Sequence, residues 1–109
     1  MKVFIYQPMK GRTDAEIQMA RNAIILHLQE TYDDVEILPS YFENYEPTGG
    51  CVPLKYLAKS LEMLADADMA YFAAGWDKAR GCRIENTCAI EYGIEVVEDY
   101  RSEKERGYK

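Results

Sequence analysis

The sequence predicts an α/β domain with a parallel sheet of four to five strands and helices on its faces. Short apolar runs, which suit strands buried on both faces of a parallel sheet, alternate along the chain with longer segments of helical periodicity. The resulting order, β-α-β-α-β-α-β, is typical of such sheets. With 109 residues, the chain is long enough for one domain with a modest core. We expect this domain to span residues 1–97.

The first half of the chain begins with an apolar strand at residues 3–6, followed by a short turn. Thr13 and Glu16 form a capping-box pattern, which predicts a helix from about residue 14 to about residue 30. The other elements expected in this half are a strand at residues 35–38 and a long connection at residues 39–53.

The second half contains two further helices. Pro53 is placed to open the first of them, because proline fits the first helical turn. Ile84, Cys88 and Tyr92 recur at four-residue spacing in the next one, and Gly93 ends it. The other expected elements are strands at residues 69–72 and 94–97, and a charged tail at 98–109 that could be a terminal helix, a frayed end or a subunit contact.

The composition narrows the possible partners. A formal net charge of -6 makes a nucleic-acid polymer a poor ligand, because phosphate contacts need clustered cations. The three cysteines lack metal-ligand spacing and the single histidine has no evident partner, so we expect reduced thiols in a cytoplasmic protein with no metal and no cofactor. The sequence shows neither a signal peptide nor an apolar run long enough for a membrane span.

Three loops are expected to converge where ligands of parallel sheets bind, at the carboxyl ends of the strands. They comprise residues 7–12, 39–52 and 74–82. In the first loop, cations and the backbone N–H groups of a helix start can hold an anion, while the alternative is a plain turn with solvated charges. The candidate binding residues of this loop are Gln7, Pro8, Met9, Lys10 and Gly11.

The second loop carries three aromatic residues, Tyr41, Phe42 and Tyr45. They either stack on a ring of the ligand or tuck the loop onto the core. Both interpretations place the loop close to the same end of the sheet.

The third loop leads to Glu85, near the start of a helix whose dipole is expected to keep the carboxylate ionised. An ionised carboxylate in such a crevice can act as a nucleophile. The alternative is a helix-start carboxylate, or an ion-pair partner of Arg83 or Lys78. Gly81 would let a ligand approach the backbone closely. The candidate binding residues of this region are Trp76, Gly81 and Arg83.

Three segments make the chain similar to the nucleoside 2-deoxyribosyltransferase-like family, particularly its short bacterial and bacteriophage members. They are VFIYQPMKG, YLAKSLEMLADADMAYFAAGW and ARGCRIENTCAIEYGI, and the resemblance extends to about Val97. It implies a flavodoxin-like three-layer sandwich. Characterised relatives cleave the N-glycosidic bond of 2′-deoxynucleosides or their 5′-monophosphates through a glutamate nucleophile. Another base or water then resolves the glycosyl-enzyme intermediate. Such relatives are commonly dimers or larger, so we expect a homo-oligomer.

The resemblance also assigns roles to single positions. The family nucleophile matches Glu85, with Gly81 four positions before it, and the phosphate-side loop matches residues 8–11. An acidic residue that assists protonation of the leaving group matches Ser60. The candidate catalytic positions are Glu85 and Ser60 from these matches, together with Tyr6, whose hydroxyl is close in sequence to the position of a family tyrosine.

Three positions depart from the family's pattern. A serine replaces the assisting acid at residue 60, Phe4 replaces a tyrosine of the first strand, and Ala79 replaces a serine. Tyr6 carries the nearest hydroxyl in sequence to Phe4. Three functions therefore stand side by side. The protein is an N-glycosidase or deoxyribosyltransferase acting on a small nucleoside or nucleotide, a binding module for such a molecule without turnover, or a protein that engages partners through its acidic surface.

Overall fold

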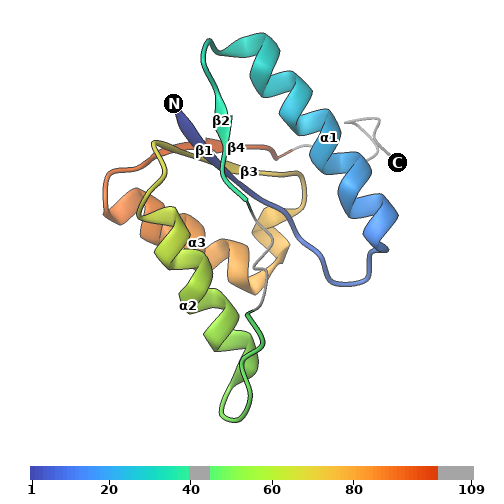
Figure 1. The fold of residues 1–109 in the computed structure, drawn as a ribbon, viewed down its shortest axis with the longest axis vertical. Helices are drawn as coiled ribbons and strands as arrows, with labels where there is room; N and C mark the ends of the chain where they lie inside the picture. The colour runs from blue at the N-terminus through green and yellow to red at the C-terminus, as the bar shows by residue number, and fades with distance from the viewer. Residues whose placement is uncertain (40–44, 101–109) are drawn as a thin grey trace.

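Four parallel strands form the centre of the protein in its computed structural model, which describes residues 1–39 and 45–100. They lie in the order β2-β1-β3-β4 (Figure 1). The strands are β1 (Lys2–Tyr6), β2 (Glu36–Ile37), β3 (Met69–Phe72) and β4 (Glu95–Glu98). The helices are α1 (Asp14–Thr31), α2 (Val52–Leu64), α3 (Arg80–Glu91) and a 3₁₀ turn, η1 (Trp76–Lys78). The predicted α/β class is confirmed, and the strand order is that of a flavodoxin-like sandwich.

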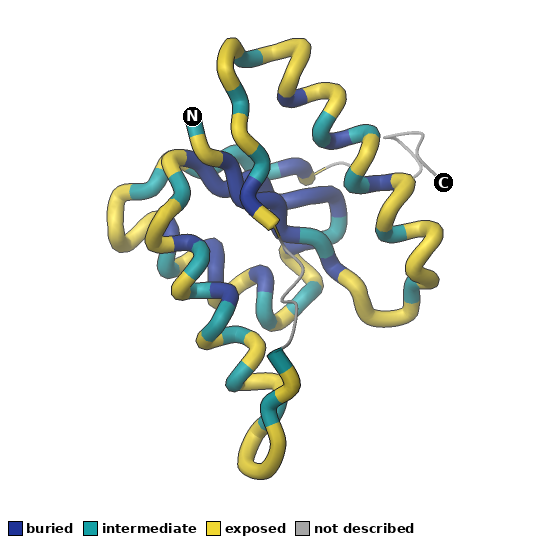
Figure 2. Tube along the Cα trace, viewed as in Figure 1, coloured by how far each residue is buried: buried dark blue, intermediate teal, exposed yellow. Residues whose placement is uncertain are grey.

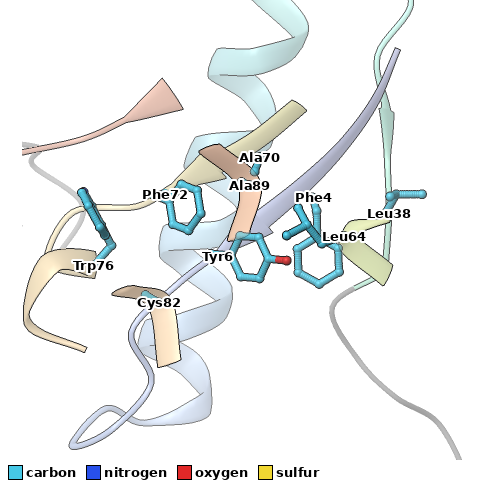
Figure 3. Packing of buried hydrophobic residues seen from close by; sticks show 9 residues of the cluster. All are labelled: Phe4, Tyr6, Leu38, Leu64, Ala70, Phe72, Trp76, Cys82 and Ala89. Carbon is cyan, nitrogen blue, oxygen red and sulfur yellow. The ribbon is translucent and has the colours of Figure 1, made fainter. Parts of the chain in front are cut away.

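Helices cover both faces of the sheet, because alternate side chains of each strand point to opposite faces. Val3 and Ile5 of β1 pack with Ile24 and Leu28 of α1 on one side. The other face packs against α2 and α3, on the opposite side of the sheet from α1 (Figure 1). Figure 2 shows the buried residues concentrated in the strands and on the inward sides of the helices. The cluster on the second face, drawn in Figure 3, consists of Phe4, Tyr6, Leu38, Leu64, Ala70, Phe72, Trp76, Cys82 and Ala89.

Polar contacts fix the ends of the first elements. The Asp68 carboxylate, just before β3, accepts a hydrogen bond from the backbone N–H of Lys2 at 2.7 Å. This contact joins the starts of β1 and β3, whose residues pair in parallel register. At α1, Thr13 and Glu16 form the predicted capping box, with each side chain accepting from the other's backbone N–H. The capping box therefore fixes the helix side of the turn between β1 and α1.

The buried face of helix α3 differs from the face predicted by the four-residue spacing of Ile84, Cys88 and Tyr92. Tyr92 is 84% exposed and Ile84 is 40% exposed. The buried residues of the helix recur at positions i, i+3, i+4 and i+7, and they are Cys82, Glu85, Asn86 and Ala89. Two of these are polar, and both have partners: Asn86 donates a hydrogen bond to Glu98 at 2.7 Å, and Glu85 accepts one from Ser60. These bonds offset the cost of burying the two side chains.

The end of the described chain continues the fold beyond residue 97. Strand β4 ends at Glu98, and the backbone N–H of Asp99 donates to the carbonyl of Phe72. The Tyr100 ring contacts Trp76 edge-on, with 5.6 Å between ring centroids. The rest of the expected tail, residues 101–109, lies outside the described residues. Within the described part of the chain, no helix has both the length and the apolar character needed to cross a membrane.

Candidate functional site

A cleft of about 980 Å³ opens at the carboxyl end of β1. Helix α1 contributes one set of its lining residues, and α2 with the start of α3 contributes another. Residues of all three predicted loops also take part, although Tyr41 and Phe42 lie outside the described residues. The described lining consists of Phe4, Ile5, Tyr6, Gln7, Met9, Asp14, Ile17, Gln18, Arg21, Pro39, Tyr45, Glu46, Pro53, Tyr56, Leu57, Ser60, Gly81 and Glu85.

Glu85 reaches this cleft from the second turn of α3, and its side chain is only 7% exposed. We expected the helix dipole to keep the carboxylate ionised, but the effect of burial is larger. Burial raises the pKa of Glu85 from its usual 4.5 to about 7, because a desolvated carboxylate favours its neutral form. Glu85 therefore titrates near neutral pH, far above the range of an exposed glutamate.

Ser60 holds Glu85 from the facing helix. Its hydroxyl, 8% exposed on α2, donates a hydrogen bond to Glu85 Oε2. This bond favours the ionised carboxylate and offsets part of the rise in the Glu85 pKa. The two candidate positions are thus brought together, and Ser60 acts on Glu85 as a hydrogen-bond donor.

Tyr6 lies on the same side of the sheet, between two other rings (Figure 3). Its ring centroid is 4.5 Å from that of Phe4 and 4.9 Å from that of Phe72. The Tyr6 hydroxyl is buried and has no hydrogen-bond partner of standard geometry among the described residues. Burial and the neighbouring Glu85 charge raise the pKa of Tyr6 well above its usual value, although the Ser60 hydroxyl is close enough to offset part of that rise. Tyr6 is therefore a neutral donor close to Glu85.

Cys82 is a buried thiol one helical turn before Glu85. Burial, reinforced by the Glu85 charge, raises the pKa of Cys82 to about 12, while Arg12 opposes the shift. A thiol with such a pKa is protonated at neutral pH and is a weak nucleophile. Among the groups around the cleft, the carboxylate of Glu85 is the better candidate nucleophile.

Only some of the predicted binding residues of the first loop line the cleft. Gln7 and Met9 line it, and Gln7 Nε2 is held by the carbonyl of Ile17 at 3.1 Å. Lys10 is exposed and does not appear in the lining. The other two loop residues absent from the lining are the buried Pro8 and the exposed Gly11.

Of the three candidates in the third region, only Gly81 lines the cleft. A Cβ built at Gly81 would lie 3.8 Å from Glu85 Oε1, an ordinary van der Waals distance. Trp76 is absent from the lining and packs in the core, with its ring 5.4 Å from that of Phe72. Arg83 is exposed, and its Nη1 donates to the carbonyl of Asp77 at 3.3 Å.

Several lining residues were not predicted, and four of them belong to helix α1. Asp14, Ile17, Gln18 and Arg21 follow the spacing i, i+3, i+4 and i+7, so they form one stripe along the helix. In the sequence, these residues form a partly polar stripe next to the apolar face of the helix, and this stripe could have indicated them as lining residues. Tyr56 of α2 was also missed, and its ring meets that of Tyr45 edge-on at 5.4 Å.

The described lining offers the buried carboxylate of Glu85, the hydroxyls of Ser60, Tyr6, Tyr45 and Tyr56, and the guanidinium of Arg21. Within residues 1–39 and 45–100, no three His, Cys, Asp or Glu side chains are grouped so that they could hold a metal ion. In comparisons with known proteins, no family model, curated protein or solved structure matches this chain.

Proposed function

We propose that the protein binds a nucleoside or nucleotide in this cleft and cleaves its N-glycosidic bond, with Glu85 as the nucleophile. The observation that carries the proposal is the buried Glu85 carboxylate, which lines a cleft at the strand ends and is held by Ser60. A positioned and partly desolvated carboxylate is the group that glycosyl-transfer chemistry requires. The cleft is also large enough for a molecule of this size.

In the proposed first step, a Glu85 carboxylate oxygen forms a bond to the anomeric carbon while the bond from that carbon to the base nitrogen breaks. The electron pair of the broken bond leaves with the base, which takes up a proton from water. The second step breaks the sugar–Glu85 ester, and the sugar is passed to water or to another base. Glu85 must be ionised to attack, so the hydrogen bond from Ser60 supports the reactive form. The Tyr6 hydroxyl is suited to donate to an oxygen of the bound sugar.

Release of free base from a panel of nucleosides tests this proposal. The panel comprises the common 2′-deoxynucleosides, the ribonucleosides and their 5′-monophosphates, with products separated by chromatography. We expect the wild-type protein to release base from some member of the panel and Glu85→Gln to release none above background. Glu91→Gln, an exposed change on the same helix, is the matched control and should retain activity. An absence of base release from the whole panel would rule out the enzymatic function.

A nucleotide-binding protein without turnover is the second candidate. The Ser60–Glu85 pair itself favours it, because a carboxyl group whose pKa is raised and that is already hydrogen-bonded forms a contact without any substrate. This function predicts that a nucleoside or nucleotide raises the melting temperature and is recovered chemically unchanged. Recovery of free base from the same incubation would exclude it.

A further inference from the structure

We propose that Arg21 forms an anion-binding subsite in the cleft and selects ligands that carry a phosphoryl or carboxylate group. The inference deepens the proposed function, since it concerns the same cleft and names the class of ligand. Arg21 belongs to α1, whereas Glu85 reaches the cleft from α3, so the anionic group would be held by a different element from the reacting carbon.

The position of Arg21 is the first support. It is the only arginine or lysine among the described lining residues of the cleft. Its Nη2 donates a hydrogen bond to the carbonyl of Leu38 at 3.3 Å, which ties the guanidinium to the end of β2. Held in this way, the side chain is oriented before a ligand arrives, which reduces the entropy lost on binding.

The second support is the hydrogen-bonding state of the Arg21 guanidinium among the described residues. Arg21 is half-buried, and its Nη1 is buried without a hydrogen-bond partner among the described residues. Burial lowers the pKa of Arg21, which means that the charged form is poorly solvated there. A guanidinium offers five N–H donors in a planar fork that matches the oxygens of a phosphoryl or carboxylate group. An anionic ligand would supply both an acceptor for Nη1 and a counter-charge.

The carboxylates of the same lining restrict where an anion can bind. Asp14 and Glu46 are exposed to solvent, where water and salt screen their charges. Glu85 is buried, and burial raises its pKa, which disfavours its charged form. An anionic group is therefore directed toward Arg21 and away from Glu85. Lys10, the cation that the sequence suggested for this task, is absent from the described lining.

Paired ligands that differ only in an anionic group test the subsite. Dissociation constants would be measured by calorimetry for 2′-deoxynucleosides and their 5′-monophosphates, with inorganic phosphate and deoxyribose 5-phosphate as further probes. To prevent turnover, the measurements use Glu85→Gln as the background. We expect the monophosphates to bind at least about tenfold more tightly than the matched nucleosides. Adding Arg21→Gln should remove that preference and leave nucleoside affinity nearly unchanged.

Two further variants sharpen the result. Arg21→Lys keeps the charge and should keep part of the preference, while Lys10→Gln should keep all of it. The melting temperature of each variant without ligand identifies any loss of fold. Three results would overturn the subsite. The first is equal affinity for nucleosides and monophosphates in the parent protein, and the second is that no probe binds. The third is a preference for monophosphates that is lost in Lys10→Gln but retained in Arg21→Gln. These results are independent of base release, which decides the proposed function separately.

Discussion

The Ser60 hydroxyl of α2 donates a hydrogen bond to the Glu85 carboxylate of α3, and the two buried side chains line the same cleft. This contact joins two helices through residues that are 25 positions apart in sequence. It places an ionisable group in a poorly solvated position, which costs stability, and it supplies the donor that limits the cost. The predictions below separate what this arrangement does for the fold from what it does for a ligand.

Glu85→Gln should change how stability depends on pH. The wild-type Glu85 pKa is about 7 when folded and near 4.5 when unfolded, so between these values the folded state keeps a proton that the unfolded state has released. Wild-type stability should therefore fall as pH rises from about 4.5 to about 7 and then level off, a loss on the order of 3 kcal/mol. Glutamine does not ionise, so the Glu85→Gln variant should not show this decrease in stability. Urea unfolding at pH 5 and pH 8 measures the difference, with Glu91→Gln as the exposed control.

A gain of stability by Glu85→Gln over wild type at pH 8, with little gain at pH 5, is the expected result. If both proteins follow the same pH curve, Glu85 is not buried as an ionisable group.

Ser60→Ala should raise the Glu85 pKa further. The Ser60 hydrogen bond favours the ionised carboxylate, and its removal leaves burial unopposed. The Glu85 titration, followed by ¹³C NMR of the labelled side-chain carboxyl carbon, should move to higher pH. If activity needs ionised Glu85, the rise of the reaction rate with pH should also shift to higher pH. An unchanged or lower pKa in Ser60→Ala would show that the hydroxyl does not act on Glu85.

Tyr6→Phe should separate stability from function. The Tyr6 hydroxyl is buried without a partner of standard geometry, so its removal should leave the free energy of unfolding unchanged or raise it by about 1 kcal/mol. The ring contacts with Phe4 and Phe72 are retained. If the hydroxyl contacts the ligand, affinity or turnover should nonetheless fall. A clear loss of stability with intact ligand binding would assign Tyr6 a purely structural role.

Gly81→Ala should narrow the cleft without damaging α3. The added Cβ would lie 3.8 Å from Glu85 Oε1, and Gly81 is in the first turn of the helix. Because alanine is the better helix former, stability should be unchanged or should rise by about 0.5 kcal/mol. The methyl group would occupy space beside Glu85, so ligand affinity should decrease. Unaltered affinity in a folded variant would place the ligand away from this part of the lining.

The sequence predicted the sheet well because β1 and β3 are apolar runs that are buried on both faces. The Thr13–Glu16 capping box likewise located the start of α1, since its pattern is local. The edge strand β2 is shorter than expected, and only Glu36 and Ile37 pair with β1. Local patterns therefore predicted the elements better than their precise ends.

The site was predicted only in part because burial depends on neighbours distant in sequence. Glu85 and Gly81 were identified, but no local pattern shows that a carboxylate is buried against Ser60. Trp76 follows a strand end, as a ligand-binding residue often does, yet it packs on Phe72 in the core. Arg21 was missed because the sequence does not distinguish a solvated arginine on a helix from one that contacts another element. Only the fold shows that the end of β2 lies beside it.

Covalent trapping tests the role of Glu85 most directly. A fluorine at C2′ of the sugar destabilises the oxocarbenium-like transition state. With a good leaving group, the glycosyl-enzyme intermediate still forms, but its hydrolysis becomes slow, so the intermediate accumulates. Incubation with 2′-deoxy-2′-fluoro nucleosides and nucleotides, followed by mass spectrometry of the intact protein and its peptides, should show one fluorinated sugar attached to the peptide containing Glu85. Glu85→Gln should show none. An adduct on another residue, or an unmodified wild-type protein, would contradict the proposed mechanism.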